Sequence, residues 1–222
     1  DAAMRNVHFR RAVMFSIDRA TMVAQRKGED LKYNCMINAY VPGNFVYLSK
    51  EVTVDINGES VTFPAGTAYG TIRQRQLEAD GSTMKTFDEE TGLGTGFDGW
   101  YNPEAANAEL ATAIEELAAQ GYEISAENPV YLDIASFTGN DSFKNQDQAL
   151  KQSVESVLGG VVIVNIVPCD TQKDWLNATY YPNTGAEMNF NIGNNGGWGP
   201  DYGDPKSYLP GGNGMTKSFG LF

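Results

Sequence analysis

The sequence has no long apolar run, a single histidine, two cysteines and few basic residues for its acidic content. No window approaches the roughly eighteen consecutive apolar residues of a membrane-spanning helix, so no such helix is predicted. The 16 Lys and Arg residues are scattered among 28 Asp and Glu residues, and the net charge is -12. This charge argues against a nucleic-acid ligand and against docking to an anionic membrane surface.

The scarcity of histidine and cysteine limits the chemistry further. His8 is the only histidine and no G-x-S-x-G motif exists, so a Ser-His-acid triad is not expected. A zinc site would need mostly carboxylate ligands, and we expect neither a metal nor a cofactor. His8 is interpreted as a helix-surface residue. Cys35 and Cys169 leave a disulfide open, although buried free thiols are the expected state.

What is present is typical of a folded domain. The chain has 222 residues, of which 41% are hydrophobic and 20% are charged. This length allows one substantial domain or two small ones. No signal peptide is recognised, and the start at Asp1 leads us to expect a processed product or a piece excised from something longer.

Residues 6–28, NVHFRRAVMFSIDRATMVAQRKG, are predicted to form one helix. Its apolar side chains recur at helical spacing, and Gly28 is a plausible end. A second helix begins at Asn102 as N-cap with Pro103 in its first turn, and ends at Gly121. Its apolar stripe consists of Ala106, Leu110, Ala113 and Leu117.

The next segments alternate between strand and helix. VYLDIAS (130–136) is a predicted strand, and a helix through Leu150, Val154 and Val157 follows it. VVIVNIV (161–167) is then almost uniformly apolar, as expected of a parallel strand covered on both faces. Together these segments predict a β-α-β unit and the α/β class.

Residues 44–100 contain a predicted hairpin followed by a polar loop. EVTVDINGESVTF has two alternating runs joined by Asn57-Gly58. GTGFDG (94–99) matches G-x-G-x-x-G, but it follows no buried strand and opens no helix, so it is interpreted as a loop without a nucleotide. Its acidic neighbours fit no EF-hand spacing and are interpreted as solvated: Asp80, Asp88, Glu89, Glu90 and Asp98.

The stretch GGWGPDYGDP (196–205) is the candidate functional segment. It follows a further predicted strand, MNFNIG (188–193), and ligands in open α/β sheets sit beyond the carboxyl ends of strands. Two interpretations stay open on these residues alone. Either Trp198 and Tyr202 are core anchors and Asp201 and Asp204 cap turns, or the segment holds a ligand. A carboxylate-pair hydrolase is the less favoured enzyme alternative.

Four stretches in order resemble the extracellular oligopeptide-binding proteins, the family 5 solute-binding proteins of bacterial peptide ABC importers. They are NVHFRRAVMFSIDR, YNPEAANAELATAIEELAAQGY, ALKQSVESVLGGVVIVNIV and GWGPDYGDPKSYL. With the closing TKSFGLF, the chain is most similar to the lipoprotein receptors of Gram-positive bacteria.

The resemblance implies a type II periplasmic-binding-protein-like fold, with two α/β lobes hinged around a cleft. Residues 1–222 would be one C-terminal lobe, a mixed sheet with flanking helices and a variable insertion at about 44–100. The partners implied are an oligopeptide, the N-terminal lobe and the permease subunits. The location implied is the outer face of the cytoplasmic membrane through a lipid anchor, or the periplasm in a Gram-negative cell.

The resemblance also assigns the site and makes the chain a non-enzymatic receptor. In similar receptors the aspartate after Trp-Gly-Pro receives the peptide's α-ammonium group, which here is Asp201, and the neighbouring aromatic, Trp198, lines the cleft. Secondary candidates are Tyr202, Asn194, Asn195 and Gly197. Family members that bind glycosides or metal chelates remain the alternative within this fold.

Overall fold

A computed structural model describes residues 2–34, 36–39, 41–184, 187–188 and 190–193 of the chain. Within these ranges no helix combines the length and the apolar character needed to cross a bilayer. The helices and the two small sheets confirm the α/β class, with parallel and antiparallel pairing in separate sheets.

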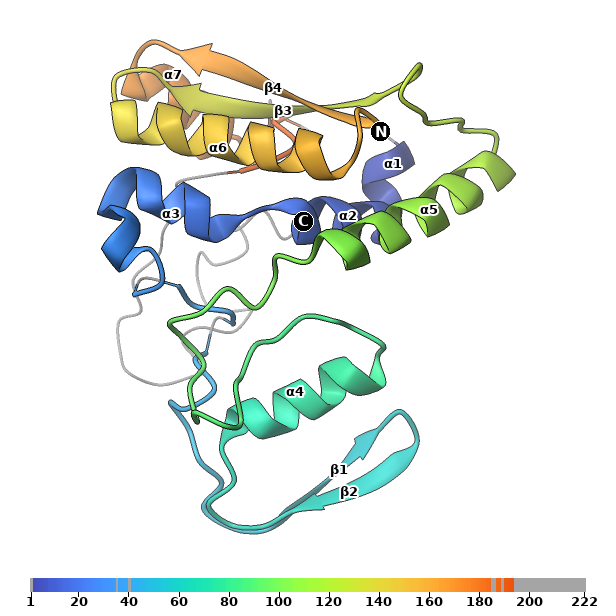
Figure 1. The fold of residues 1–222 in the computed structure, drawn as a ribbon, viewed down its shortest axis with the longest axis vertical. Helices are drawn as coiled ribbons and strands as arrows, with labels where there is room; N and C mark the ends of the chain where they lie inside the picture. The colour runs from blue at the N-terminus through green and yellow to red at the C-terminus, as the bar shows by residue number, and fades with distance from the viewer. Residues whose placement is uncertain (1, 35, 40, 185–186, 189, 194–222) are drawn as a thin grey trace.

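The predicted β-α-β unit is confirmed. Strand β3 (Val130–Phe137) pairs in parallel with β4 (Val162–Cys169), with Val130 opposite Val162 and Phe137 opposite Cys169. Helix α6 (Asp141–Val157) connects them and covers one face of the pair, as Figure 1 shows. Asn140 caps this helix by accepting a hydrogen bond from the Phe143 amide.

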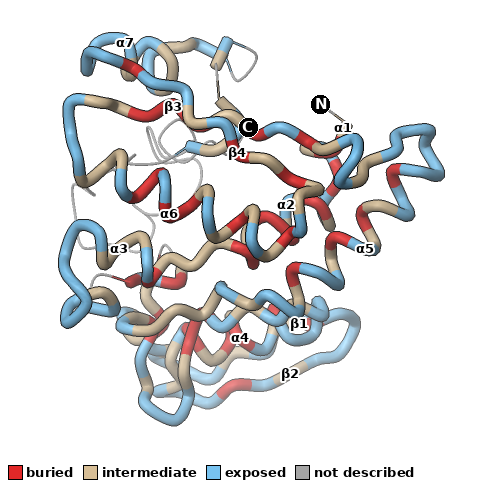
Figure 2. Tube along the Cα trace, turned by 45° about the horizontal axis from the view of Figure 1, so that its top comes forward, coloured by how far each residue is buried: buried red, intermediate tan, exposed pale blue. Residues whose placement is uncertain are grey.

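The main hydrophobic core lies between this sheet and the helices beneath it. Helix α5 (Pro103–Ala119) packs against α2 (Val7–Ser16), and both contribute to the core with α6. Figure 2 shows the buried positions on the sides of these elements that face one another. The largest fully buried apolar side chains are Phe9, Leu117, Leu132, Ile134, Leu158, Val154, Val162 and Val164.

The expectation that the strand at 161–167 is covered on both faces is wrong. Val162 and Val164 are buried, whereas Asn165 and Val167 are exposed, so burial alternates along β4. The same holds for the start of β3, where Tyr131 is 55% exposed. The helices α2, α5 and α6 all lie on one face, and this face alone is apolar enough to be a core.

The further strand predicted at 188–193 is reduced to one isolated bridge. Ile192 pairs in parallel with Ile134 in the middle of β3. The amides of Asn191 and Ile192 both donate to the carbonyl of Asp133, at 2.8 and 3.1 Å. The side-chain oxygen of Asn191 accepts a hydrogen bond from the Asp133 amide. A side chain thus takes the place of a backbone acceptor, so the backbone hydrogen bonds of a regular parallel strand pair do not form here.

The single helix predicted over residues 6–28 is wrong in its continuity. The structure has α2, then a break at Ile17 and Asp18, and then α3 (Arg19–Lys27). Asp18 accepts a hydrogen bond from the Thr21 amide and thereby begins a new helix. A short helix, α1 (Ala2–Arg5), precedes α2, and the 3-10 turn η1 (Glu29–Leu31) follows α3.

Helix α5 is confirmed with its cap and its stripe. Asn102 accepts a hydrogen bond from the Ala105 amide, and Pro103 occupies the first turn. The chain ends the helix at Gln120 and Gly121, the latter with φ 84°. All four predicted stripe residues are buried, namely Ala106, Leu110, Ala113 and Leu117.

The predicted hairpin is confirmed, and a helix that was not predicted packs on it. Strands β1 (Val52–Ile56) and β2 (Glu59–Phe63) are joined by a two-residue turn in which Asn57 and Gly58 both have positive φ. Helix α4 (Tyr69–Ala79) follows, and Ile56, Phe63 and Ile72 form a small core of their own. In Figure 1 this unit lies apart from the parallel sheet.

Two of the three glycines in residues 94–99, Gly94 and Gly99, lie in close contact with other backbone segments, which supports the interpretation of this stretch as a loop. A side chain at Gly94 would collide with the backbone at Gly43, and one at Gly99 would collide with the carbonyl of Lys85. The Lys85 amide also donates to the Gly99 carbonyl at 2.8 Å. The motif is therefore a site of close backbone approach.

Replacing Leu132 by Ala tests whether the inner face of β3 carries the stability of the main core. We expect the free energy of unfolding to fall by about 2–5 kcal/mol, because the fully buried side chain leaves a cavity. Its neighbour Tyr131 points to the exposed face, and Tyr131→Ala is expected to cost less than about 1 kcal/mol. Urea unfolding followed by circular dichroism measures both; equal losses would contradict the account.

Candidate ligand-binding site

The six residues predicted to bind ligand lie outside the described residues. Gly193 is the last described position, and the predictions begin at Asn194. The structure therefore neither brings Asn194, Asn195, Gly197, Trp198, Asp201 and Tyr202 together nor separates them. What it describes is the framework from which this segment continues.

That framework is the central part of β3. Because Ile192 pairs in parallel with Ile134, the chain at 190–193 runs in the same direction as β3, towards its carboxyl end. Asp133 fixes this contact through its backbone, and its carboxylate accepts a hydrogen bond from Asn165 of β4 at 3.1 Å. The candidate segment thus continues from a position anchored beside the parallel pair.

The contact between β3 and α6 becomes polar towards the carboxyl end of β3. The inner face of β3 is apolar at Leu132 and Ile134 and then carries Ser136, which is buried. On α6 the buried residues change in the same direction, from Val154 to Gln146 and Asp147. The sheet therefore ends in a polar region at the edge where α/β proteins bind ligands.

Two buried polar atoms of this region lack a hydrogen-bond partner among the described residues. The Ser136 hydroxyl oxygen and the Gln146 side-chain oxygen are buried, and within the described residues neither has a hydrogen-bond partner. Both can accept an N–H donor, and the serine can also donate. Both atoms are buried, so they form a polar contact region between β3 and α6.

The carboxyl ends of both strands are tied to each other and to α7 (Gln172–Thr179), which was not predicted. The Thr138 amide donates to the Cys169 carbonyl at 3.0 Å, and the Trp175 indole donates to the Ala135 carbonyl at 3.1 Å. These bonds fix the backbone at the edge of the sheet.

Cys169 is a buried free thiol, so it agrees with the expected state and not with a disulfide. Burial raises the pKa of the Cys169 thiol, and the nearby carboxylates of Asp174 and Asp170 raise it further. A raised pKa means less thiolate at neutral pH. The residue is structural at this edge and not a reactive nucleophile.

Alkylation by iodoacetamide tests this interpretation of Cys169. We expect the thiol to react more slowly at pH 8 than an unstructured cysteine, and to gain reactivity as the pH rises through its raised pKa. Mass spectrometry of the peptide that contains Cys169 measures the rate. The control is the same chain in urea, where the thiol should react at the ordinary rate; equal rates in both states would refute the assignment.

A second polar cluster joins segments that lie far apart in the sequence. The Arg19 guanidinium donates to Asp98 at 2.7 and 3.1 Å and to the Asn38 side-chain oxygen at 2.6 Å. It also lies over the Trp100 ring, 4.4 Å from the centroid. The Trp100 indole completes the cluster by donating to the Asn38 carbonyl. No spacing rule links residues 79 positions apart, which is why this cluster was not predicted.

The interpretation of Asp98 as a solvated loop residue is wrong. Its side chain is only 9% exposed, and it is paired with Arg19. A cavity of about 530 Å³ adjoins it, lined also by Asp18, Lys32 and Tyr33. Lys32 is bonded to Glu29 and brings its own positive charge to this cavity, so the lining shows no preference for one sign of charge.

The remaining sequence candidates are structural. His8 is only partly exposed and is hydrogen-bonded to Glu109, with Glu116 3.6 Å from its other ring nitrogen, so it is held at the helix surface by side chains of α5. Asp88 accepts from the Thr91 hydroxyl, which lowers the pKa of the Asp88 carboxyl, and from the Glu90 amide. Across the described ranges no group of His, Cys, Asp and Glu is arranged to hold a metal ion.

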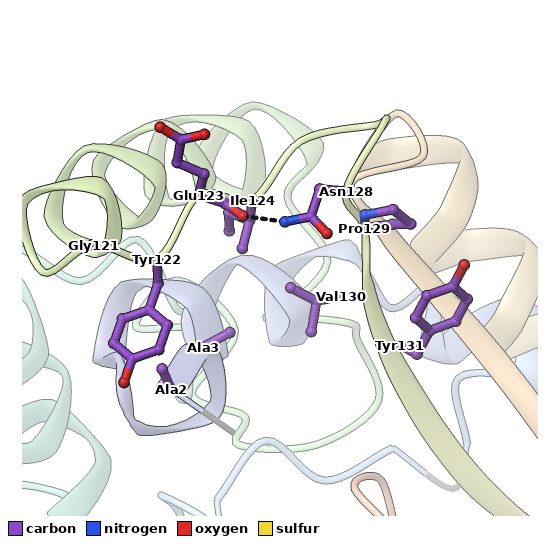
Figure 3. A pocket seen from close by; sticks show the side chains of 10 residues that line it. All are labelled: Ala2, Ala3, Gly121, Tyr122, Glu123, Ile124, Asn128, Pro129, Val130 and Tyr131. Carbon is purple, nitrogen blue, oxygen red and sulfur yellow. Dashed lines mark hydrogen bonds between the residues drawn. The ribbon is translucent and has the colours of Figure 1, made fainter.

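A third feature is the cavity of about 450 Å³ drawn in Figure 3. It lies where β3 begins, and Tyr122 and Tyr131 stand on either side of it. Its polar contact is internal, since Asn128 donates to the Glu123 carbonyl. It offers no convergent polar side chains for a ligand.

Comparison with known proteins gives a consistent set of relatives. No protein-family model matches the chain. The oligopeptide-binding protein SarA of Streptococcus gordonii is 34% identical over 98% of the chain, which corresponds to 30% of SarA. The oligopeptide-binding protein AmiA of Streptococcus pneumoniae is 30% identical over 93% of the chain and 28% of AmiA. The chain thus spans about a third of the length of its curated relatives or less.

The fold agrees with these sequence relatives. The structure of Listeria monocytogenes OppA bound to peptide matches 99% of this chain with a TM-score of 0.50, over 33% of that protein. The sequence identity in this match is 14%, so it concerns the fold alone. The type II binding-protein fold, of which the chain forms a part, is thereby supported independently of the sequence motifs.

Replacing Arg19 by Ala tests the weight of the second polar cluster. The change leaves the Asp98 carboxylate buried without its cation, and we expect the free energy of unfolding to fall by about 3–5 kcal/mol. Arg75 is a matched control, because it also pairs with a carboxylate but in an exposed and looser contact. Its side chain is 59% exposed, and its guanidinium lies 3.8 Å from the Glu78 carboxylate. Arg75→Ala should cost less than about 1 kcal/mol in the same urea titration. A loss below that value for Arg19→Ala would contradict the assignment.

Proposed function

We propose that this chain, which is homologous along nearly its whole length to a part of the oligopeptide-binding proteins, belongs to a receptor that captures extracellular oligopeptides for import. The relatives are several times longer than the chain, so the proposal concerns the complete receptor. In it, residues 1–222 form one α/β lobe and contribute one wall of the binding cleft. The receptor binds and releases its ligand unchanged and has no enzymatic step.

The observation that carries this proposal is the match to SarA, at 34% identity over 98% of the chain. The part of the chain that precedes the candidate segment is consistent with it. Ile192 pairs in parallel with Ile134 of β3, and the carboxyl end of β3 carries the buried polar residue Ser136 opposite Gln146 of α6. A polar edge of this kind suits a ligand made of peptide groups.

The ligand's constant features explain why an aspartate is suited to this segment. Peptides of different sequence share one α-ammonium group and a backbone of donors and acceptors. We assign Asp201 to the ammonium group, because a charge-assisted hydrogen bond of this kind contributes about 1.5–3 kcal/mol. Side chains of the peptide are then free to vary without loss of this anchor.

The other candidate residues have supporting roles. Trp198 and Tyr202 present aromatic faces to the peptide, while Asn194 and Asn195 offer amide groups to its backbone. Gly197 lets the receptor backbone approach the ligand closely. A peptide that lies extended in the cleft would pair with backbone groups, and its side chains would enter wet pockets.

The remaining partners belong to the complete receptor. The N-terminal lobe closes the cleft, and the permease subunits of an ABC transporter receive the loaded receptor. A lipid anchor holds the receptor at the outer face of the membrane. The net charge of -12 is consistent with these partners, which include no nucleic acid.

Replacing Asp201 by Ala in the complete receptor tests the ammonium anchor. We expect the affinity for a peptide with a free N-terminus to fall by about 2–5 kcal/mol, because one member of a desolvated charge pair is lost. At about 1.4 kcal/mol per tenfold change this is roughly 30-fold to several thousandfold in Kd. Isothermal titration calorimetry measures the change.

Two controls make this result specific. Acetylation of the same peptide removes its charge and should weaken binding to the native receptor, but should add little to the loss in Asp201→Ala. Asp204→Ala removes a nearby carboxylate and should change affinity by less than about 0.5 kcal/mol. Independent, additive losses from acetylation and from Asp201→Ala would exclude the direct contact while leaving the peptide receptor intact.

A further inference from the structure

The two edges of the parallel sheet differ in the groups that contact their backbone. The carbonyl of Val161, just before β4, and that of Cys169, at its end, face β3, since they accept the amides of Val130 and Thr138. Backbone groups alternate in direction along a strand. The outer edge of β4 is therefore formed by the backbone groups of Val162, Val164, Ile166 and Pro168.

At the middle of this outer edge both backbone groups of Val164 are occupied by side chains of α6. The Val164 amide donates to the Glu155 carboxylate at 3.0 Å, and its carbonyl accepts from the Lys151 ammonium at 2.6 Å. The two side chains also pair with each other at 2.7 Å. An incoming strand would have to displace this ion pair to reach the backbone.

Near the end of the edge, proline continues the same obstruction. Pro168 occupies an outward position and has no amide hydrogen to offer to a neighbouring strand. Proline within a sheet is tolerated at such edges. Together with Val164, it removes donors at two of the four outward positions of β4.

The sequence of β4 explains why an obstruction is useful. Residues 162–167 read VIVNIV, in which five of the six residues have strong β-propensity and none is charged or proline. Val167 is 40% exposed, and among the described residues no strand pairs with this edge. An unprotected edge of this kind is a template for another strand of the same sequence.

We propose that Lys151 and Glu155, with Pro168, block strand addition at β4, and that the partner they exclude is a second copy of this chain. The assignment makes β4 the closed edge of the sheet. The opposite edge is the one used internally, because Asp133 of β3 is already bonded to Asn191 and Ile192. Further segments of the chain can therefore pair with the sheet at β3 and not at β4.

The test is the double variant Lys151→Ala, Glu155→Ala, compared with Asp141→Ala, Lys144→Ala. The control removes another ion pair from the same helix, 2.6 Å in length and more exposed. Multi-angle light scattering across a concentration series should show at least a doubling of mass for the first variant and a monomer for the control. A monomeric first variant with a native circular dichroism spectrum would overturn the proposal.

A third substitution separates edge pairing from aggregation of a misfolded chain. Adding Val167→Lys to the double variant places a charge on the exposed face beside the opened edge, which disfavours strand pairing. We expect this triple variant to return to a monomer. If it self-associates as strongly as the double variant, the association does not occur through β4 and the proposal fails.

Discussion

The structure depends on the burial of one face of the β3–β4 pair beneath α6. Leu132 and Ile134 of β3 meet Val154 of α6 and Val162 and Val164 of β4, and all five side chains are fully buried. Burial of an aliphatic side chain of this size contributes about 1.5–3 kcal/mol. Helices α2 and α5 extend this core, and the bridge at Ile192 is positioned against the same strand.

The same arrangement prepares one end of the sheet for function. Where the β3–α6 contact loses its apolar residues, Ser136 and Gln146 are buried with unused hydrogen-bonding capacity. Residues 190–193, which precede the ligand-binding candidates in the chain, run parallel to β3. Arg19 of α3 is bonded to Asp98 and to the Ile37 carbonyl, and so joins this helix to two loops that are distant in the sequence. A rigid core with loops at its carboxyl edge is an effective way to present a binding wall.

Sequence patterns predicted the elements whose signals are local. Asn102 and Pro103 marked the start of α5, Asn57-Gly58 marked the hairpin, and alternation of strand and helix marked the parallel pair. The break at Asp18 was missed because an apolar stripe can continue across a capped junction between two helices. The pairing of Arg19 with Asp98 was missed because contacts between distant segments leave no periodic signal. The ligand-binding residues rest on a family resemblance and stay predictions.

The central claim is that the complete receptor captures peptides, and native mass spectrometry of that receptor as purified tests it most directly. The receptor is transferred intact, its bound ligand is released in the gas phase, and the ligand masses are fragmented for sequence. The account predicts a heterogeneous ladder of short peptides, unchanged and with free N-termini. A single discrete non-peptide mass would contradict it: the fold would stand, and Asp201 would need a different partner.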